Sequence, residues 1–209
     1  MTGDAEAALL AIIAERPGDA DARLVYADWL EGQADERATV VRLHHQLTTL
    51  VETLAFEDPA LLACSRELIE RGHGMMPSWL ALLGHPPLAR TSWGTRTHHG
   101  DPYLLALRVG GVLAYRQNDY SASPGTWMQI GNAVAFQING YSPHEGVLVG
   151  DRMRGLGCNQ DGNSWTWEIC RLADDVYDTP GVPELPPQPR DHDFLDGTLA
   201  SEWKLRLRV

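Results

Sequence analysis

The pattern of apolar residues changes at Pro86-Pro87, and this change constrains the fold more than any other feature of the chain. Before the two prolines, apolar side chains recur at the three- and four-residue spacing of helices, whereas after them short apolar runs alternate with turn residues. Helices followed by a series of antiparallel strands predict an α+β protein. We expect a helical module over residues 1–85, an antiparallel β-barrel or curled sheet over residues 86–172, and an acidic, proline-rich linker with a terminal β-strand over residues 173–209.

Composition and charge narrow the classes of partner. The 209 residues are 44% hydrophobic, which is enough for a buried core. The net charge of −11 argues against nucleic acid and anionic membranes as partners, since both need a basic face. The chain has neither a run of about 18 apolar residues nor a signal-peptide pattern, so we expect a cytoplasmic protein. Three cysteines without CxxC spacing fit reduced thiols, and a disulfide between Cys158 and Cys170 is the alternative.

Helix boundaries are readable in the first part of the chain. Short carboxylates that can accept hydrogen bonds from free N–H groups mark helix starts, and glycine or proline marks helix ends. Five helices are predicted: one that ends at Arg16-Pro17, one from Asp19 or Asp21 to Gly32, one over residues 35–55, one after Asp58-Pro59 and a short one around Trp79. The apolar seam of the third helix could mate with a second chain, but packing against the first two helices is the favoured interpretation.

Turn pairs divide the second part of the chain into short segments. Gly and Asn supply the positive φ angles of tight hairpins, so apolar runs of six to eight residues between such pairs predict an antiparallel meander. The expected strands cover residues 103–109, 112–118, 125–130, 133–139, 145–150, 152–158 and 164–171. Six or seven consecutive strands predict a small barrel or a strongly curled sheet.

The segment Arg23–Glu31, with the sequence RLVYADWLE, belongs to the second predicted helix. It is expected to bury Leu24, Ala27, Trp29 and Leu30. The run from Pro17 to Leu47, within about residues 8–47, resembles the repeat-companion domain of planctomycetes and myxobacteria, whose pattern is P-x-D…RLVYADWLEE…G-D…R…RL. This chain carries Gln33-Ala34-Asp35 where that family commonly has Gly-Asp.

The repeat-companion family occurs beside leucine-rich repeats and other interaction modules. The resemblance therefore implies protein binding, with Asp28 and Trp29 as parts of a packing and docking scaffold. From the residues alone, Asp28 could cap the next helix or pair with Arg23 or Arg37.

Residues 125–171 also resemble lipocalin-like β-meander domains, in which a GTW strand precedes G-D-x-M-x-G and G-x-x-W-x-W hairpins. Large aromatic residues gather on these strands and their neighbours: Tyr115, Trp127, Phe136, Trp165 and Trp167. Trp165 and Trp167 share one strand face, so the rings could line a cavity for a small apolar or sugar-like ligand. A filled interior is the commoner outcome for a barrel of this size.

The tail from Ala173 to Gly197 holds seven acids and five prolines, which predicts an extended linker that does not fold alone. Asp174, Asp175 and Asp178 are its predicted partner contacts. Apolar and basic residues alternate over residues 203–209, which predicts a terminal strand that pairs with a sheet edge.

Two groups of side chains could support catalysis or metal binding. His98-His99 and Asp101 are residue types that zinc prefers, but a polar loop is the favoured interpretation. Cys158 could act as a nucleophile if His144 approached it. The sequence around Cys158 carries no cysteine-protease signature, which favours a thiol in a barrel wall.

The combined prediction is a non-enzymatic protein that binds or regulates another protein, in a bacterial signalling or conflict system as the resembled family implies. No cofactor, metal, nucleic acid or membrane partner is predicted. The alternative is a lipocalin-like barrel that binds a small ligand, and a cysteine- or metal-dependent hydrolase is the third hypothesis.

Overall fold

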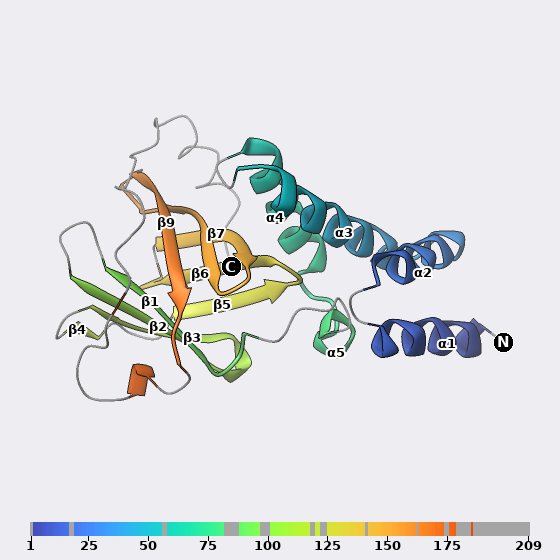
Figure 1. The fold of residues 1–209 in the computed structure, drawn as a ribbon, viewed down its shortest axis with the longest axis horizontal. Helices are drawn as coiled ribbons and strands as arrows, with labels where there is room; N and C mark the ends of the chain where they lie inside the picture. Colours follow the sequence, from blue (N-terminus) through green and yellow to red (C-terminus); the bar gives the residue numbers. More distant parts are fainter. Residues whose placement is uncertain are drawn as a thin grey trace. The chain divides into compact units, whose positions relative to one another are not determined.

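The computed structural model describes residues 2–16, 19–55, 58–81, 88–96, 101–117, 120–121, 125–140, 142–161, 163–173, 176–178 and 185. The chain forms two compact units, Met1–Pro87 with Gln129–Ala133, and Leu88–Met128 with Val134–Val209. Helices make up the first unit and antiparallel strands the second (Figure 1). The α+β class is confirmed.

The helical unit contains α1 (Thr2–Glu15), α2 (Ala20–Gly32), α3 (Arg37–Thr53), α4 (Pro59–Gly72) and the short α5 (Pro77–Leu80). The carboxylate of Asp19 caps α2 by accepting from the Ala22 N–H, and Asp58 caps α4 in the same way. The predicted helix starts are confirmed, with Asp19 rather than Asp21 as the cap. Helix α3 packs against α2 and α4, and its seam residues Val40 and Leu47 are fully buried within the unit.

The segment Arg23–Glu31 packs differently from the prediction. Tyr26, Ala27 and Leu30 are buried, whereas Leu24 and Trp29 are half-buried. The indole of Trp29 instead stacks on the Tyr26 ring at 6.1 Å between centroids. Because successive helical residues are turned by about 100°, the buried face is centred on Tyr26 and Leu30, and Trp29 lies on its flank.

Tyr26 connects the helices through hydrogen bonds. Its hydroxyl donates to Glu6 on α1 at 2.8 Å and accepts from the Trp79 indole N–H on α5 at 3.0 Å. Arg37, at the start of α3, forms ion pairs of 2.7 Å with Glu6 and with Asp35. One shared polar cluster therefore fixes α1, α2, α3 and α5 together.

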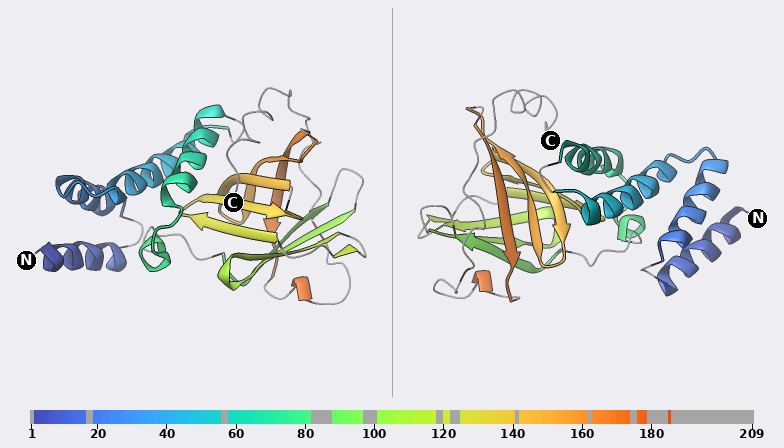
Figure 2. Two further views of the ribbon diagram at one scale, coloured as in Figure 1. Left: turned by 180° about the vertical axis from the view of Figure 1, so that it is seen from behind. Right: turned by 45° about the horizontal axis from the view of Figure 1, so that its top comes forward.

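The strand unit is a closed barrel. Its strands are β1 (Thr91–Arg96), β2 (Pro102–Leu107), β3 (Val112–Gln117), β4 (Tyr120–Ser121), β5 (Gly125–Ile130), β6 (Ala133–Ile138), β7 (Ser142–Val149), β8 (Arg152–Cys158) and β9 (Ser164–Arg171). They pair in the order β2-β1-β9-β8-β7-β6-β5-β3-β4, and a further β2–β3 pairing closes the ring. Eight strands enclose the interior and the short β4 extends from β3 (Figure 2).

Strand β1 was not predicted, and it completes the ring between β2 and β9. Thr91, Trp93 and Thr95 face the barrel interior, and Gly94 lies on the other face. Because Trp93 is the one large apolar residue of this strand, the sequence shows no apolar run here. Strand β7 begins at Ser142, three residues before the predicted start. The prediction began too late because the first residues of this strand are polar and do not belong to its apolar run.

Cys64, Cys158 and Cys170 are all free, so the structure holds no Cys158–Cys170 disulfide. In the β8–β9 register Cys158 lies opposite Ser164 and Cys170 opposite Arg152, so the two thiols lie at opposite ends of the hairpin. Among the described helices, none is long and apolar enough to cross a membrane.

The start of the acidic tail packs on the barrel. The short helix η3 (Val176–Asp178) contacts β1 and β2, and Asp178 forms a 2.8 Å ion pair with Arg108. Leu185 is 4% exposed. The predicted contacts Asp174 and Asp175 and the predicted terminal strand lie outside the described residues.

Candidate ligand cavity in the barrel

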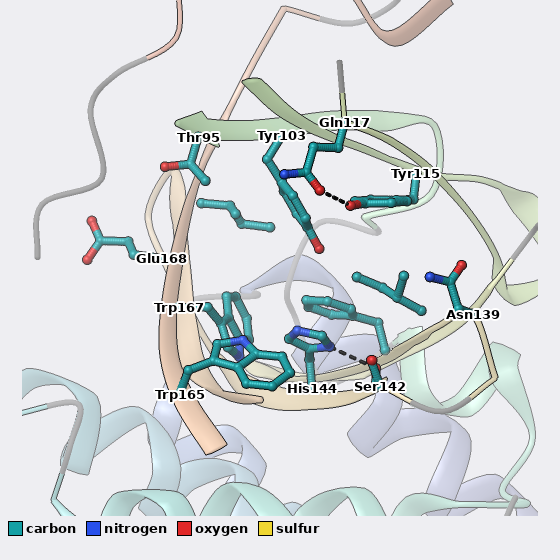
Figure 3. Close-up of a pocket in the computed structure, with 13 residues that line it drawn as sticks. Thr95, Tyr103, Tyr115, Gln117, Asn139, Ser142, His144, Trp165, Trp167 and Glu168 are labelled. Atoms are coloured by element: carbon teal, nitrogen blue, oxygen red, sulfur yellow. Dashed lines mark hydrogen bonds between the residues drawn. The ribbon is translucent and has the colours of Figure 1, made fainter. Parts of the chain in front are cut away.

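A cavity of about 280 Å³ occupies one end of the barrel (Figure 3). Its lining consists of Thr95, Tyr103, Tyr115, Gln117, Phe136, Ile138, Asn139, Ser142, His144, Trp165, Trp167, Glu168 and Ile169. Most of these residues come from the ends of β1, β3 and β6 and from the starts of β2, β7 and β9, which meet at the same end of an antiparallel barrel.

The opposite end of the barrel is filled. Inward-facing side chains there form one packed cluster that includes Leu105, Leu107, Leu113, Val134, Leu148 and Met153. The interior is therefore neither wholly filled nor wholly open, because bulky aliphatic residues occupy one end and rings surround a cavity at the other.

A glycine on β8 makes room for an indole on β9 and for His144. In the β8–β9 register Gly157 lies opposite Trp165 and Gly155 opposite Trp167. A Cβ atom on Gly157 would lie 2.7 Å from the Trp165 ring and 2.7 Å from His144 Cδ2. The absence of a side chain at Gly157 is thus a condition for the present positions of both rings.

The aromatic rings of the wall contact one another closely. His144 stacks on Phe136 with 4.7 Å between ring centroids and an angle of 9°. Trp165 meets His144 edge to face at 5.4 Å, and Trp167 meets Phe136 in the same way at 5.0 Å. Such edge and stacked pairs stabilise large rings in defined orientations, so this side of the cavity is preformed.

His144 is oriented by its own strand. Its Nδ1 lies 2.9 Å from the Ser142 carbonyl oxygen, which can only accept a hydrogen bond. In the neutral ring the proton therefore sits on Nδ1, and Nε2 is the acceptor nitrogen.

Two tyrosines lie across the cavity from His144 and the indoles (Figure 3). Tyr115 donates to the Gln117 side-chain oxygen at 2.6 Å, and its ring meets the Tyr103 ring edge to face at 4.9 Å. The Tyr103 hydroxyl points into the cavity (Figure 3). Burial raises the pKa of Tyr103 well above its ordinary value, so this hydroxyl keeps its proton and remains a hydrogen-bond donor.

The wall carries little charge toward the cavity. Glu168 is the one acidic residue in the described lining, and it pairs with Arg152 at 2.8 Å. Its carboxylate points away from the other lining side chains (Figure 3). Within the described residues there is also no group of three or more His, Cys, Asp or Glu side chains that could hold a metal ion.

The wall loosens between two strands beside the cavity. Strands β1 and β9 are paired at Trp93 with Arg171 and at Gly94 with Cys170. The next residues along each strand, Thr95 and Ile169, both line the cavity and are not paired with each other.

Four of the five predicted ligand residues line the cavity together: Tyr115, Phe136, Trp165 and Trp167. Trp127 lies apart from them. It packs against the filled core, and its indole N–H donates to the Arg108 carbonyl oxygen at 2.8 Å.

Sequence reasoning missed Tyr103 and Gln117 as lining residues, and it considered His144 only as a base for Cys158. Tyr103 and Gln117 lie opposite each other in the β2–β3 register, so knowledge of that register would have placed them on the same face as Tyr115. Cys158 follows Gly157, whose position faces His144, so its side chain lies on the opposite face of β8. This arrangement does not support a His144–Cys158 catalytic pair. His98 and His99 lie outside the described residues.

The predicted partner residues lie on separate surfaces. Asp28 is exposed on α2 and pairs with Arg42 on α3, rather than with Arg23 or Arg37. Arg42 also binds Glu31 at 2.7 Å. Asp178 is bound to Arg108 on the barrel.

Comparison with protein-family models, curated proteins and solved structures found no significant match. The resemblances to the repeat-companion and lipocalin-like domains stay predictions, and the geometry of the cavity is the basis for assigning a function.

Proposed function

We propose that the barrel binds a small, largely apolar molecule in its hollow end. The observation that carries this proposal is the preformed cavity of about 280 Å³ with aromatic walls, in a barrel whose other end is solidly packed. Ligand sites are typically apolar cavities with a few convergent polar groups. Here Tyr103, Gln117 and His144 are among the polar residues of the lining.

Binding without catalysis is the favoured role. The cavity holds a histidine and two tyrosines, and Cys158, the one cysteine considered as a nucleophile, is on the opposite strand face. The neutral, apolar wall suits transport or sensing of a ligand more than stabilisation of a charged transition state.

Replacing a small lining residue of the cavity by a large one tests this role. Ser142→Phe would place a ring among the lining residues, whereas Thr126→Phe adds the same ring at an exposed position of β5. Thermal-shift titration with neutral aromatic fragments of about ten non-hydrogen atoms should stabilise the wild type and Thr126→Phe and leave Ser142→Phe unshifted. Equal shifts in both variants, or no shift in the wild type, would contradict binding in the cavity.

A second candidate function is protein binding through the helical unit, as the resembled family implies. The specific observation is an exposed apolar side chain beside exposed acids, since Val25 is 54% exposed and the Asp28 and Glu31 side chains are each 68% exposed. A partner with a complementary basic rim and an apolar centre suits this surface of α2.

Co-purification from the native host tests the second candidate. Val25→Lys should remove the partner, and Ala63→Lys, at an exposed position of α4, should retain it. Retention of the same partner by Val25→Lys would exclude this surface.

A further inference from the structure

We propose that the cavity selects a neutral, planar, two-ring molecule that carries a hydrogen-bond acceptor, and that the Tyr103 hydroxyl donates to this acceptor. The inference rests on the proposed ligand-binding function and specifies the ligand class. It draws on the size, the wall geometry, the polar groups and the charge of the cavity.

The volume sets the size of the ligand. A cavity of about 150 Å³ admits benzene, with six non-hydrogen atoms. The barrel cavity of about 280 Å³ is nearly twice as large. On the same scale it holds roughly ten or eleven non-hydrogen atoms, which is the size of two fused rings.

The walls favour a flat molecule. Tyr103 and Tyr115 lie on one side of the cavity, and His144, Trp165 and Trp167 lie on the other (Figure 3). Aromatic pairs prefer offset-stacked or edge-to-face contacts, and a planar ring placed between these groups can make both kinds. The stack of His144 on Phe136 keeps its side of the wall in place before a ligand arrives.

The Tyr103 hydroxyl supplies the selecting polar contact. It points into the cavity, and within the described part of the chain it has no hydrogen-bond partner (Figure 3). The neighbouring Tyr115 hydroxyl, in contrast, is bonded to Gln117 at 2.6 Å. A ligand without an acceptor would displace water from Tyr103 and leave its O–H unpaired, which disfavours that ligand relative to an acceptor-bearing one of the same shape.

The charge of the wall favours a neutral ligand. The Glu168 carboxylate points away from the cavity and is paired with Arg152. A charged ligand would therefore lose its hydration without gaining an opposite charge from the described lining. Aromatic faces attract cations, so a cationic probe belongs in the test.

Quinoline and naphthalene form a matched pair of probes, since both are flat two-ring molecules of ten non-hydrogen atoms and only quinoline carries an acceptor. Binding to the full chain can be followed by tryptophan fluorescence. We expect the wild type to bind quinoline on the order of tenfold more tightly than naphthalene, the usual effect of one hydrogen bond to a buried group. In Tyr103→Phe the preference for quinoline should be lost or reversed, because the ring remains while the buried quinoline nitrogen no longer has a donor.

Tyr177→Phe is the control, because Tyr177 lies on η3, contacts Arg108 and Arg116, and is not part of the described lining. It should keep the wild-type preference. Equal binding of both probes to the wild type, or a quinoline preference that survives in Tyr103→Phe, would overturn the inference and leave the ligand-binding function standing. Tighter binding of N-methylquinolinium than of quinoline would overturn the neutral class. Failure of both neutral probes to bind would remove the ligand-binding function and the inference together.

Discussion

Tyr26 is the residue that organises the helical unit. It is 2% exposed, and its hydroxyl joins Glu6 to the Trp79 indole. The sequence motif predicts a helix around it, but names Trp29 rather than Tyr26 among the buried residues. The structure places Trp29 on the flank of the helix, so a mutation there should cost less than one at Tyr26.

Tyr26→Phe should lower the free energy of unfolding of the helical unit by about 1–3 kcal/mol, since it breaks two hydrogen bonds and leaves the Trp79 N–H buried without a partner. Urea unfolding followed by far-UV circular dichroism measures this loss. Tyr177→Phe, at a half-buried position on η3, should remain within about 0.5 kcal/mol of the wild type. A Tyr26→Phe variant as stable as the wild type would contradict the network.

The stability of the helical unit should also fall at high pH. Burial raises the pKa of Tyr26 from 10.0 to about 12. The folded unit thus holds the proton more tightly than the unfolded chain, so this contribution is present below pH 10.0 and is lost as the pH rises toward about 12. Burial raises the pKa of Cys64 to about 11 as well, so the share of Tyr26 is the difference between the wild type and Tyr26→Phe. Parallel stability profiles of the two proteins between pH 9 and 12 would contradict this assignment.

At the scale of elements, the cavity depends on the pairing of an indole-bearing strand with a glycine-bearing one. Gly155 and Gly157 on β8 lie under Trp167 and Trp165 on β9. A bulky residue in place of Gly157 would displace the rings of Trp165 and His144, which line the hollow end.

Gly157→Ala should move His144 and Trp165, because the added Cβ would lie 2.7 Å from both. Overpacking of this kind destabilises a core by about 1–3 kcal/mol, and thermal unfolding followed by near-UV circular dichroism should show a barrel weakened by that amount. Gly32→Ala is the matched control, since outside its own stretch of helix no atom lies within 4 Å of its added Cβ. A Gly157→Ala protein with unchanged stability and unchanged tryptophan signals would show that the two rings do not depend on this glycine.

Strands with alternating apolar residues and glycine-containing turns could be predicted from the sequence, as could the helix caps Asp19 and Asp58. Strand β1 could not, because one tryptophan among Thr, Ser and Gly gives no periodic signal and its role depends on distant partners in β2 and β9. The same limit applies to the site. Trp165 and Trp167 are visible as a pair on one strand, whereas Tyr103 and Gln117 join them only after barrel closure brings β2 and β3 round to the same cavity.

For the molecule as a whole, the structure describes two units and a tail whose first part binds the barrel. Leu185, Leu172 and Leu104 all approach Gly94 on the outer face of β1. The sequence predicts a linker that does not fold alone. The packing of Leu185 shows that one apolar residue of this linker can pack against the neighbouring sheet.

Leu185→Ser should release the tail from the barrel, because it removes a buried apolar contact in a segment otherwise rich in proline and acid. Limited proteolysis should then cut the segment between residues 173 and 185 several-fold faster, with little change in barrel melting. Asp178→Asn should have a small effect, since its ion pair with Arg108 is exposed. Equal cleavage rates in the wild type and Leu185→Ser would contradict this anchoring.

The central claim is that the hollow end of the barrel receives a small aromatic molecule, and the most direct measurement is the position of bound quinoline by intermolecular nuclear Overhauser effects. The account predicts contacts from quinoline protons to the rings of Tyr103, Phe136 and Trp165, which line one cavity. Contacts confined to surface residues such as Val25 or Tyr177, or no contacts at saturating quinoline, would contradict it.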